Sequence, residues 1–340
     1  MKHVNSFWVK SFKRVEIFSF TLIIVFIGFG GASAQTELKF ADSLPKSYAY
    51  FPAMHAFKAA AEGTSKSLTI SLFPEAVLGD QKALLEATKI GSIDIAIVAN
   101  QVSQQLAPEH GVFGLPFVWA TLGDYMKFIQ SPTAIDIGRR LEPHGIKVLT
   151  FANGGSMAIV NSKRAVKGPE DMKGLKLRVM QDPMQIDMIR SMGGIPVPMG
   201  VPEVYSAIQQ GQLDGHASVT QVLWASKSHE VAKHLSVTAH GRSVGVVIMN
   251  LRKWNSLNPE QKLAVEVGTK AFFENHQGFF VSNPNTSDEN IVGFMTKSGV
   301  TVTEPDIAAF RKATAPIVQA FRTRVKSPLV ERALAEAGVK

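Results

Sequence analysis

Arg178 is the side chain of this sequence whose setting best suits the capture of an anion. It lies in KGLKLRV, residues 173–179, where apolar and basic residues alternate, and this period of two predicts a strand with one apolar face. Asp182 and Pro183 then open a helical segment, so we expect Arg178 at the carboxyl end of the strand, where open α/β sheets bind ligands. A guanidinium there can donate paired hydrogen bonds to a carboxylate. The spacing alone also permits a structural arginine that pairs with an acid or reaches the surface.

The residues after Arg178 form an ordered series of predicted elements. A helix ends at Gly193, a proline-rich strand covers 195–199, a second helix covers 202–210, and Leu213 begins another short strand. This order and many of its residues resemble the DctP-type solute-binding subunits of tripartite ATP-independent periplasmic (TRAP) transporters. Their signature is close to GLKxRVP followed by GxxPxPMxxxEVYxALQxGxVDGxEN.

The residues that match this signature are 174–179, Pro196, Pro198, Met199, 203–205, Ala207, Gln209, Gly211, Asp214 and Gly215. Further matches occur at 78–80, 115–117 and 228–235. The resemblance therefore covers nearly the whole chain beyond the first 34 residues.

The resemblance implies an α/β fold of the periplasmic-binding-protein type, a two-domain clamshell with discontinuous domains and a long helix crossing both. Domain I is expected to comprise 35–155 and 244–283, and domain II 156–243 and 284–340. The resemblance also implies a receptor and not an enzyme. In this role Arg178 would bind a small organic acid, and the receptor would deliver the acid to membrane permease subunits for uptake. The alternatives are a ligand-binding partner of a membrane sensor and a periplasmic hydrolase.

Several positions expected in the ligand pocket depart from the family pattern. The second arginine frequent in the family falls on Ser156 or Met157, depending on a one-residue gap, and neither binds an anion as arginine does. The asparagine of the Asp-Gly-x-Glu-Asn turn is Ser218, and the proline that usually follows Arg-Val is Met180. The pocket should therefore be less cationic than in family members with two arginines.

The predicted ligand-binding residues combine Arg178 with polar and soft apolar side chains. They are Arg178, Asp42, Asn100, Met157, Ser156, Met180, His216 and Ser218. With one cation kept, we predict a monocarboxylate that carries an apolar or aromatic portion. Succinate, malate and fumarate should bind weakly, because a second carboxylate would be desolvated without a partner. Arg242 is the alternative source of a second cation.

Composition and spacing argue against several other kinds of site. The chain has no cysteine, which excludes disulfides, thiolate metal sites and an N-terminal lipid anchor on cysteine. The histidines lack zinc-ligand spacing, and Ser43 and Lys46 match Ser-x-x-Lys without its companion motifs. The net charge of +8 comes from basic residues that do not cluster with aromatics, so no nucleic-acid partner is expected. We expect no metal or cofactor, and a monomer.

The first 34 residues have the features of a secretory signal peptide. Basic residues up to Arg14 precede an apolar stretch at 17–29, and Ala32-Ser33-Ala34 fits the small-residue cleavage rule. The apolar stretch is short for a transmembrane helix and has no stop-transfer pattern after it. The sequence therefore predicts cleavage after Ala34 and a periplasmic location.

The rest of the chain alternates predicted strands with predicted helices, which is typical of a largely parallel sheet with right-handed crossovers. Strands are predicted at 36–41, 67–72, 94–99, 146–151, 235–238 and 244–250. Helices are predicted at 50–62, 80–91, 121–141 with a break at Pro132, 218–227, 259–282 and 307–325. Residues 153–156 interrupt the pattern and are expected to cross into domain II, and 244–250 to return.

Overall fold

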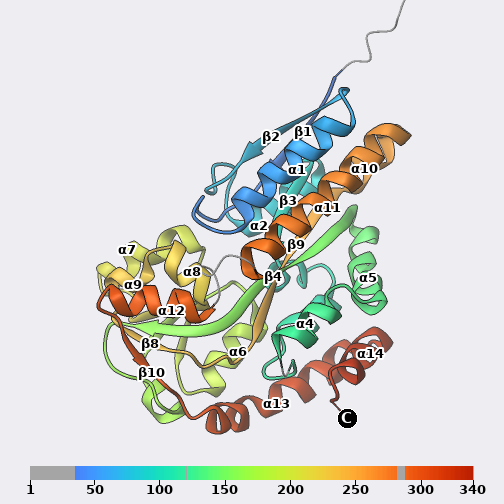
Figure 1. The fold of residues 1–340 in the computed structure, drawn as a ribbon. Helices are drawn as coiled ribbons and strands as arrows, with labels where there is room; N and C mark the ends of the chain where they lie inside the picture. The colour runs from blue at the N-terminus through green and yellow to red at the C-terminus, as the bar shows by residue number, and fades with distance from the viewer. Residues whose placement is uncertain (1–34, 120, 282–287, 340) are drawn as a thin grey trace, which may run out of the picture. The chain divides into compact units, whose positions relative to one another are not determined.

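The predicted alternation of strands and helices is present in a computed structural model that describes residues 35–119, 121–281 and 288–339 (Figure 1). The strands are β1 (Thr36–Ala41), β2 (Leu68–Phe73), β3 (Ile95–Ala99), β4 (Ile146–Asn161), β5 (Lys176–Val179), β6 (Ile195–Pro198), β7 (Gly215–Val219), β8 (His234–Ser236), β9 (Arg242–Asn250) and β10 (Thr301–Thr303). The α-helices are α1 (Tyr50–Thr64), α2 (Gln81–Ile90), α3 (Asn100–Ser103), α4 (Leu122–Phe128), α5 (Pro132–Gly138), α6 (Pro183–Ser191), α7 (Val204–Gln209), α8 (Thr220–Ala225), α9 (Ser228–Val231), α10 (Leu251–Ser256), α11 (Pro259–Val281), α12 (Asp288–Lys297), α13 (Ile307–Val325) and α14 (Pro328–Glu336). The 3₁₀ helices are η1 (Pro108–Gly114), η2 (Arg139–His144), η3 (Pro169–Met172) and η4 (Val201–Glu203).

The strands form one mixed sheet in the described residues, with the order β2-β1-β3-β9-β4-β7-β5-β6, while β8 pairs with β4 and β10 pairs with β8. We call β1–β3 with their helices the first half, and β5–β7 with theirs the second half. Within each half these strands are parallel, as predicted. The strands β9 and β4, which join the halves, run antiparallel to their neighbours. The prediction of a largely parallel sheet is therefore confirmed for each half and wrong at the junction.

The long strand β4 passes from one half to the other (Figure 1). Residues 146–156 pair with β9, and 157–161 pair with β7. The prediction that this strand ends at Phe151 is wrong, because a bulge between Asn153 and Gly155 absorbs the irregular sequence without ending the pairing. Gly155 has a φ of 103°, which favours glycine. The predicted domain crossing at 153–156 stays a prediction.

The long helix α11 packs along α1 in the first half and also contacts β4. Its predicted range of 259–282 agrees with the observed helix. Gly268 allows the close approach of the two helices, since a Cβ there would lie 3.0 Å from the carbonyl oxygen of Phe57. The next helix, α12, packs against α8 in the second half.

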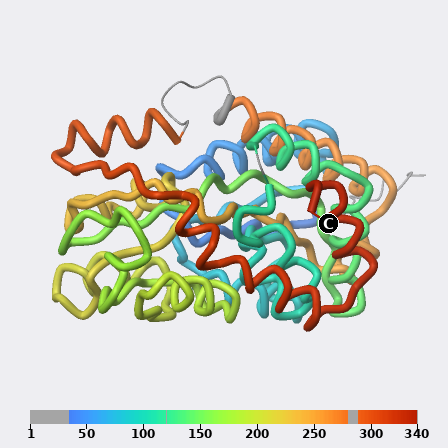
Figure 2. Tube along the Cα trace, turned by 90° about the horizontal axis from the view of Figure 1, so that it is seen from below, coloured from blue at the N-terminus to red at the C-terminus, as the bar shows by residue number. Residues whose placement is uncertain are grey.

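The C-terminal helices touch both halves. In Figure 2 the red C-terminal segment runs from the yellow-green elements of the second half to the green and teal elements of the first. Helix α13 contacts α6, whereas α14 contacts α5 and η1. The predicted domain boundaries, with 284–340 in domain II, stay predictions.

One helix begins later than predicted. The helix expected at 218–227 starts at Thr220, because Ser218 belongs to β7 and pairs with Ala158 of β4. The break predicted at Pro132 is confirmed, since α4 ends at Phe128 and α5 begins at Pro132. Among the helices in the described ranges, none combines the length and the apolar character that crossing a bilayer requires. The predicted signal peptide, 1–34, lies outside the described residues.

Candidate functional site

Arg178 is positioned by the central strand of the second half. In β5 its neighbours Leu177 and Val179 belong to an apolar cluster, while Arg178 pairs in register with Val197 of β6 and His216 of β7. Residues in register on adjacent strands extend from the same face, so Arg178 and His216 meet. Only 2% of Arg178 is exposed, which makes it one of the largest fully buried side chains.

The guanidinium of Arg178 is held by two hydrogen bonds. Its Nε donates to the carbonyl oxygen of Met199 (2.9 Å), and its Nη1 donates to Nε2 of His216 (3.1 Å). These use two of the five N–H groups of a guanidinium. In the described part of the chain, no carboxylate forms an ion pair with it. Burial lowers the pKa of Arg178 to about 9, so it remains a cation at neutral pH.

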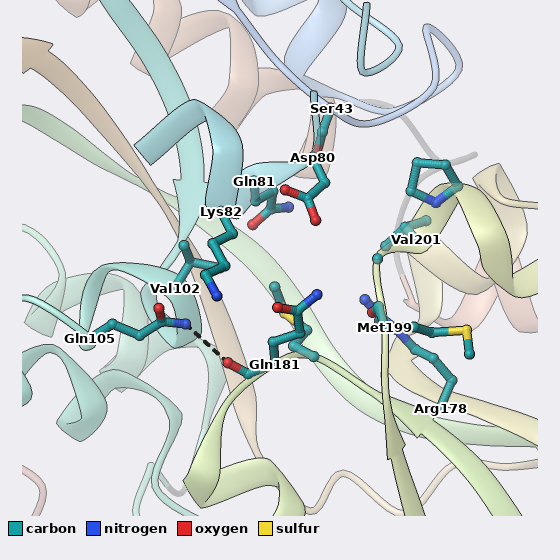
Figure 3. Close-up of a pocket in the computed structure, with 13 residues that line it drawn as sticks. Ser43, Asp80, Gln81, Lys82, Val102, Gln105, Arg178, Gln181, Met199 and Val201 are labelled. Carbon is teal, nitrogen blue, oxygen red and sulfur yellow. Dashed lines mark hydrogen bonds between the residues drawn. The ribbon is translucent and has the colours of Figure 1, made fainter. Parts of the chain in front are cut away.

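Arg178 faces two adjoining small cavities between the halves. The one we call the inner cavity has a volume of about 40 Å³, and the one we call the mouth cavity, drawn in Figure 3, about 30 Å³. The polar residues that line the inner cavity are Tyr48, Tyr50, Gln81, Arg178, Gln185, Ser218 and Ser243. Among the residues that the structure describes, no Asp, Glu, Lys or His lines it, and Arg178 is its one charged lining residue. Asp80 and Lys82 of the first half line the mouth cavity opposite Arg178 and Met199 (Figure 3).

Two glutamines add hydrogen-bond donors to the inner cavity. The Oε1 of Gln81 accepts from the backbone N–H of Ala99 (2.7 Å), and the Oε1 of Gln185 accepts from that of Met180 (3.1 Å). With both carbonyls engaged, each glutamine has its NH₂ group left for the cavity. Both side chains belong to the first turns of helices, α2 and α6, whose N-termini favour anions. The cavity is thus rich in donors.

Two aspartates at the helix starts explain how these glutamines are placed. Asp80 caps α2 by accepting from the N–H of Ala83, as predicted, and Asp182 caps α6 by accepting from the N–H groups of Met184 and Gln185. Each cap satisfies N–H groups that a helix start leaves without partners and fixes the direction in which the first turn begins.

Hydrogen bonds between the halves close the site beside the mouth cavity. The Nε2 of Gln104 donates to Asp182 (2.6 Å), and the Nε2 of Gln105 donates to the carbonyl oxygen of Gln181 (2.9 Å; Figure 3). The two cavities behind these hydrogen bonds have room for only a few water molecules. A ligand of many atoms therefore enters only if the halves separate.

We expect a hinge motion that ligand binding reverses. A ligand that contacts both halves shifts the population toward closure. Small-angle scattering should therefore give a smaller radius of gyration with saturating ligand than without it. Superimposable profiles under the two conditions would contradict the hinge.

Four of the predicted ligand-binding residues line the inner cavity: Arg178, Met157, Met180 and Ser218. Ser156 does not line it and instead accepts a hydrogen bond from Nη1 of Arg242 (3.0 Å). The guanidinium of Arg242 lies 5.7 Å from the ring centre of Tyr125. Arg242 is not among the residues that line either cavity, so it supplies no second cation there.

The other three predicted ligand-binding residues are buried away from both cavities. Asn100 accepts from the backbone N–H of Val244 through its Oδ1 (3.0 Å). His216 has both ring nitrogens in hydrogen bonds, with Arg178 and with Ser228. Asp42 is 2% exposed, and none of the three lines the inner or the mouth cavity. In the described part of the chain, no three His, Cys, Asp or Glu side chains gather as a metal site.

Burial of the ionised carboxyl group of Asp42 lowers the stability of the folded protein. Burial raises its pKa from 3.8 to about 7, although the backbone N–H groups of Leu44 and Ser43 donate to it. Its Oδ1 has no hydrogen-bond partner among the described residues. Between these two pKa values the folded protein holds a proton that the unfolded chain has released, so stability falls as pH rises from about 4 to 7.

Replacing Asp42 with asparagine should therefore stabilise the protein at pH 8, by about 1–3 kcal/mol, and should have little effect at pH 4. Denaturant unfolding at both pH values measures this difference. The matched control is Asp187→Asn, since the side chain of Asp187 is 56% exposed. A stabilisation at pH 8 no larger than that at pH 4 would contradict the cost assigned to Asp42.

Sequence reasoning missed Tyr48, Gln81 and Gln185 as cavity residues. Gln81 directly follows Asp80, in a segment that already matched the family pattern, and Gln185 follows the Asp182 cap by one turn. The first turn of a helix that follows a strand is therefore the signal that points to the two glutamines.

Comparisons with known proteins agree with this geometry. The family model described as DctP, bacterial extracellular solute-binding protein family 7, matches residues 40–324. The 2,3-diketo-L-gulonate-binding periplasmic protein YiaO of Escherichia coli is 31% identical over 253 residues, which cover 74% of this chain and 76% of that protein.

Solved structures of TRAP periplasmic solute-binding proteins share the fold. One from Bordetella bronchispeptica, with density assigned to pantoate, is 30% identical and has a TM-score of 0.82 over 88% of this chain and 99% of that one. One from Polaromonas sp. JS666, bound to D-erythronate, is 27% identical and has a TM-score of 0.83 over 90% and 99%. The predicted α/β clamshell is thereby confirmed, and the chain belongs to the DctP-type solute-binding proteins of TRAP transporters, bacterial extracellular solute-binding protein family 7.

Proposed function

We propose that this protein is a periplasmic receptor that captures a small organic monocarboxylate through Arg178 and delivers it to membrane permease subunits. Its relatives are binding proteins and not enzymes. The observation that carries the proposal is the state of Arg178: a buried cation that lines the inner cavity, with N–H groups to spare and no carboxylate partner among the described residues.

A ligand carboxylate would supply the charge that Arg178 lacks. Its two oxygens accept paired N–H groups from a guanidinium, and such bonds are about twice as strong as those between neutral groups. The N–H groups already given to Met199 and His216 fix the orientation of the fork before the ligand arrives. Less conformational freedom is then lost on binding.

The remaining lining residues suit a hydroxylated acid with an apolar portion. Gln81, Gln185 and Ser218 are hydrogen-bond partners for hydroxyl or keto oxygens, and Met157 and Met180 provide adaptable apolar surface. The ligands named for relatives, 2,3-diketo-L-gulonate, pantoate and D-erythronate, each have one carboxylate beside such oxygens. They define the class that we expect here.

A thermal-shift screen tests the proposal. The panel contains D-erythronate, pantoate, D-galacturonate, succinate, malate, and the uncharged lactones of the first two acids as controls. Ligand at 100 times its dissociation constant adds about 2.7 kcal/mol of stability, which raises the melting temperature by several degrees. At least one monocarboxylate should do so while its lactone does not. The proposal would be overturned if the lactones stabilised the protein as much as the acids do, or if none of the acids stabilised it.

A further inference from the structure

A chain of hydrogen bonds, buried at His216 and partly buried at Ser226, leads away from the far side of Arg178. Its Nη1 is 3.1 Å from Nε2 of His216, whose Nδ1 is 2.8 Å from Oγ of Ser228. That oxygen is 2.9 Å from Oγ of Ser226, which donates to the carbonyl oxygen of Val222 at 2.6 Å. We call these three residues, His216, Ser228 and Ser226, the relay.

The two ends of the relay fix the direction of every bond in it. A guanidinium can only donate, so Nε2 of His216 has no proton and accepts. The single proton of the neutral ring is then on Nδ1 and is donated to Ser228. Because the proton of Ser226 is given to Val222, Ser228 must donate to Ser226. His216 is therefore neutral and held in one tautomer, and burial beside Arg178 also lowers the pKa of His216 well below its ordinary value.

The backbone is shaped to bring the relay together. His216 faces Arg178 because β7 and β5 pair in register. Lys227, between the two serines, has a φ of 58°, a left-handed conformation that lysine adopts at a cost. This turn between α8 and α9 brings the two hydroxyls within hydrogen-bond distance. His216 and Ser228 are fully buried.

We propose that His216 is a positioning residue: through the relay it holds Arg178 toward the inner cavity while leaving its positive charge uncompensated, and so it adapts the site to a single carboxylate. This inference rests on the proposed function. A carboxylate at residue 216 would orient the guanidinium equally well, but it would also neutralise it, and a bound ligand anion would then leave one negative charge unpaired in the closed cleft. A neutral acceptor avoids that.

A second buried histidine provides an internal reference with the opposite tautomer. The Nε2 of His110 is 3.1 Å from the carbonyl oxygen of Ile137, and its Nδ1 is 2.9 Å from Oγ of Ser103. A carbonyl only accepts, so His110 must have its proton on Nε2. It lines neither the inner nor the mouth cavity. Nitrogen NMR of histidine-labelled protein distinguishes the two tautomers directly.

The first experiment needs no ligand. The NMR signals, assigned with His216→Gln and His110→Gln, should show His216 with its proton on Nδ1 and His110 with its proton on Nε2 from pH 5.5 to 8. Ser228→Ala removes the acceptor of Nδ1–H and should release His216 from its single tautomer while His110 is unchanged. A proton on Nε2 of His216 in the wild-type protein, or titration of that ring in this range, would overturn the relay.

The second experiment measures binding of D-erythronate and pantoate by calorimetry. His216→Gln keeps a neutral acceptor and should bind within about threefold of wild type. His216→Glu should bind at least roughly tenfold more weakly at pH 8, as expected when a buried anion is left unpaired. Arg178 of β5 is the charged group that acts on His216, and Glu203 of η4 acts in turn on Arg178.

The sign of the pH effect separates positioning from a purely structural role. The ligand anion competes for Arg178, so binding to His216→Glu should raise the pKa of the new carboxyl group and take up protons, and affinity should rise as pH falls. Wild type and His216→Gln should show no such uptake. Equal affinity of His216→Glu and wild type, or weaker binding without proton uptake, would overturn the inference. If Arg178→Ala binds as wild type does, or if no monocarboxylate of the thermal-shift panel binds wild type, the proposed function fails instead, and the NMR experiment remains a separate test of the relay.

Discussion

Replacing Arg178 with alanine should weaken binding of the organic acid by about 2–5 kcal/mol, which is roughly a thirty- to several-thousand-fold loss of affinity. The ligand carboxylate would enter an inner cavity that has no other charged lining residue in the described ranges, so no cation of that lining replaces the lost partner. Calorimetry with the strongest ligand of the thermal-shift screen gives the dissociation constants. Affinity of Arg178→Ala within threefold of wild type would contradict the role of Arg178.

Two further variants separate charge, geometry and folding. Arg178→Lys should recover little affinity, because an ammonium lacks the planar fork that donates to Met199, His216 and the ligand together. Arg190→Ala is the matched control, since Arg190 is in the same half, is 65% exposed and pairs with Asp187 at the surface. Unliganded Arg178→Ala should unfold at a denaturant concentration similar to that of wild type, because removal of a buried cation without an ion-pair partner offsets the loss of packing and of the bonds to Met199 and His216.

The second large effect is expected in the choice between one and two carboxylates. Succinate and malate should bind roughly 100-fold or more weakly than the best monocarboxylate, since their second carboxylate would be desolvated without a cation. Arg242, the alternative source of that cation, donates to Ser156 and lines neither cavity. Competition calorimetry measures the ratio of the dissociation constants of the dicarboxylates and the best monocarboxylate.

A gain-of-function variant tests the same point from the other side. Met157 lines the inner cavity, and Met157→Arg would add a second cation there. Met157→Arg should raise the affinity for succinate relative to that for D-erythronate. Ser156→Arg should not, because the side chain of Ser156 is directed toward Arg242. Submicromolar binding of succinate to wild type, with weaker binding of every monocarboxylate tried, would contradict the one-cation pocket.

Much of the fold is predictable from local sequence patterns. Alternation in 173–179 predicted β5, Asp80 and Gly91 marked the ends of α2, and the apolar run at 244–250 predicted the returning strand β9. These are short-range signals. The continuation of β4 beyond Phe151 was missed because pairing with β9, a partner about 90 residues away in sequence, keeps an irregular segment extended.

The site was predictable in part for the same reason. Arg178, Met157, Met180 and Ser218 follow from the register of strands and the family pattern. His216 was expected to meet the ligand, and the structure instead engages both of its ring nitrogens within the protein. The partner Ser228 is twelve residues away, beyond the strained turn at Lys227, and no local pattern indicates that hydrogen bond. Gln81 belongs to the first half, so it lines the cavity with Arg178 only when the two halves are closed.

The most direct test of the central claim is a crystal structure of the protein with the strongest acid of the screen. We expect the ligand carboxylate within about 3 Å of the guanidinium nitrogens of Arg178, with the bonds from Arg178 to Met199 and His216 retained. Its hydroxyl or keto oxygens should meet Gln81, Gln185 or Ser218. A carboxylate bound elsewhere in the cleft, for example at Lys82 with Arg178 free of contact, would contradict the account.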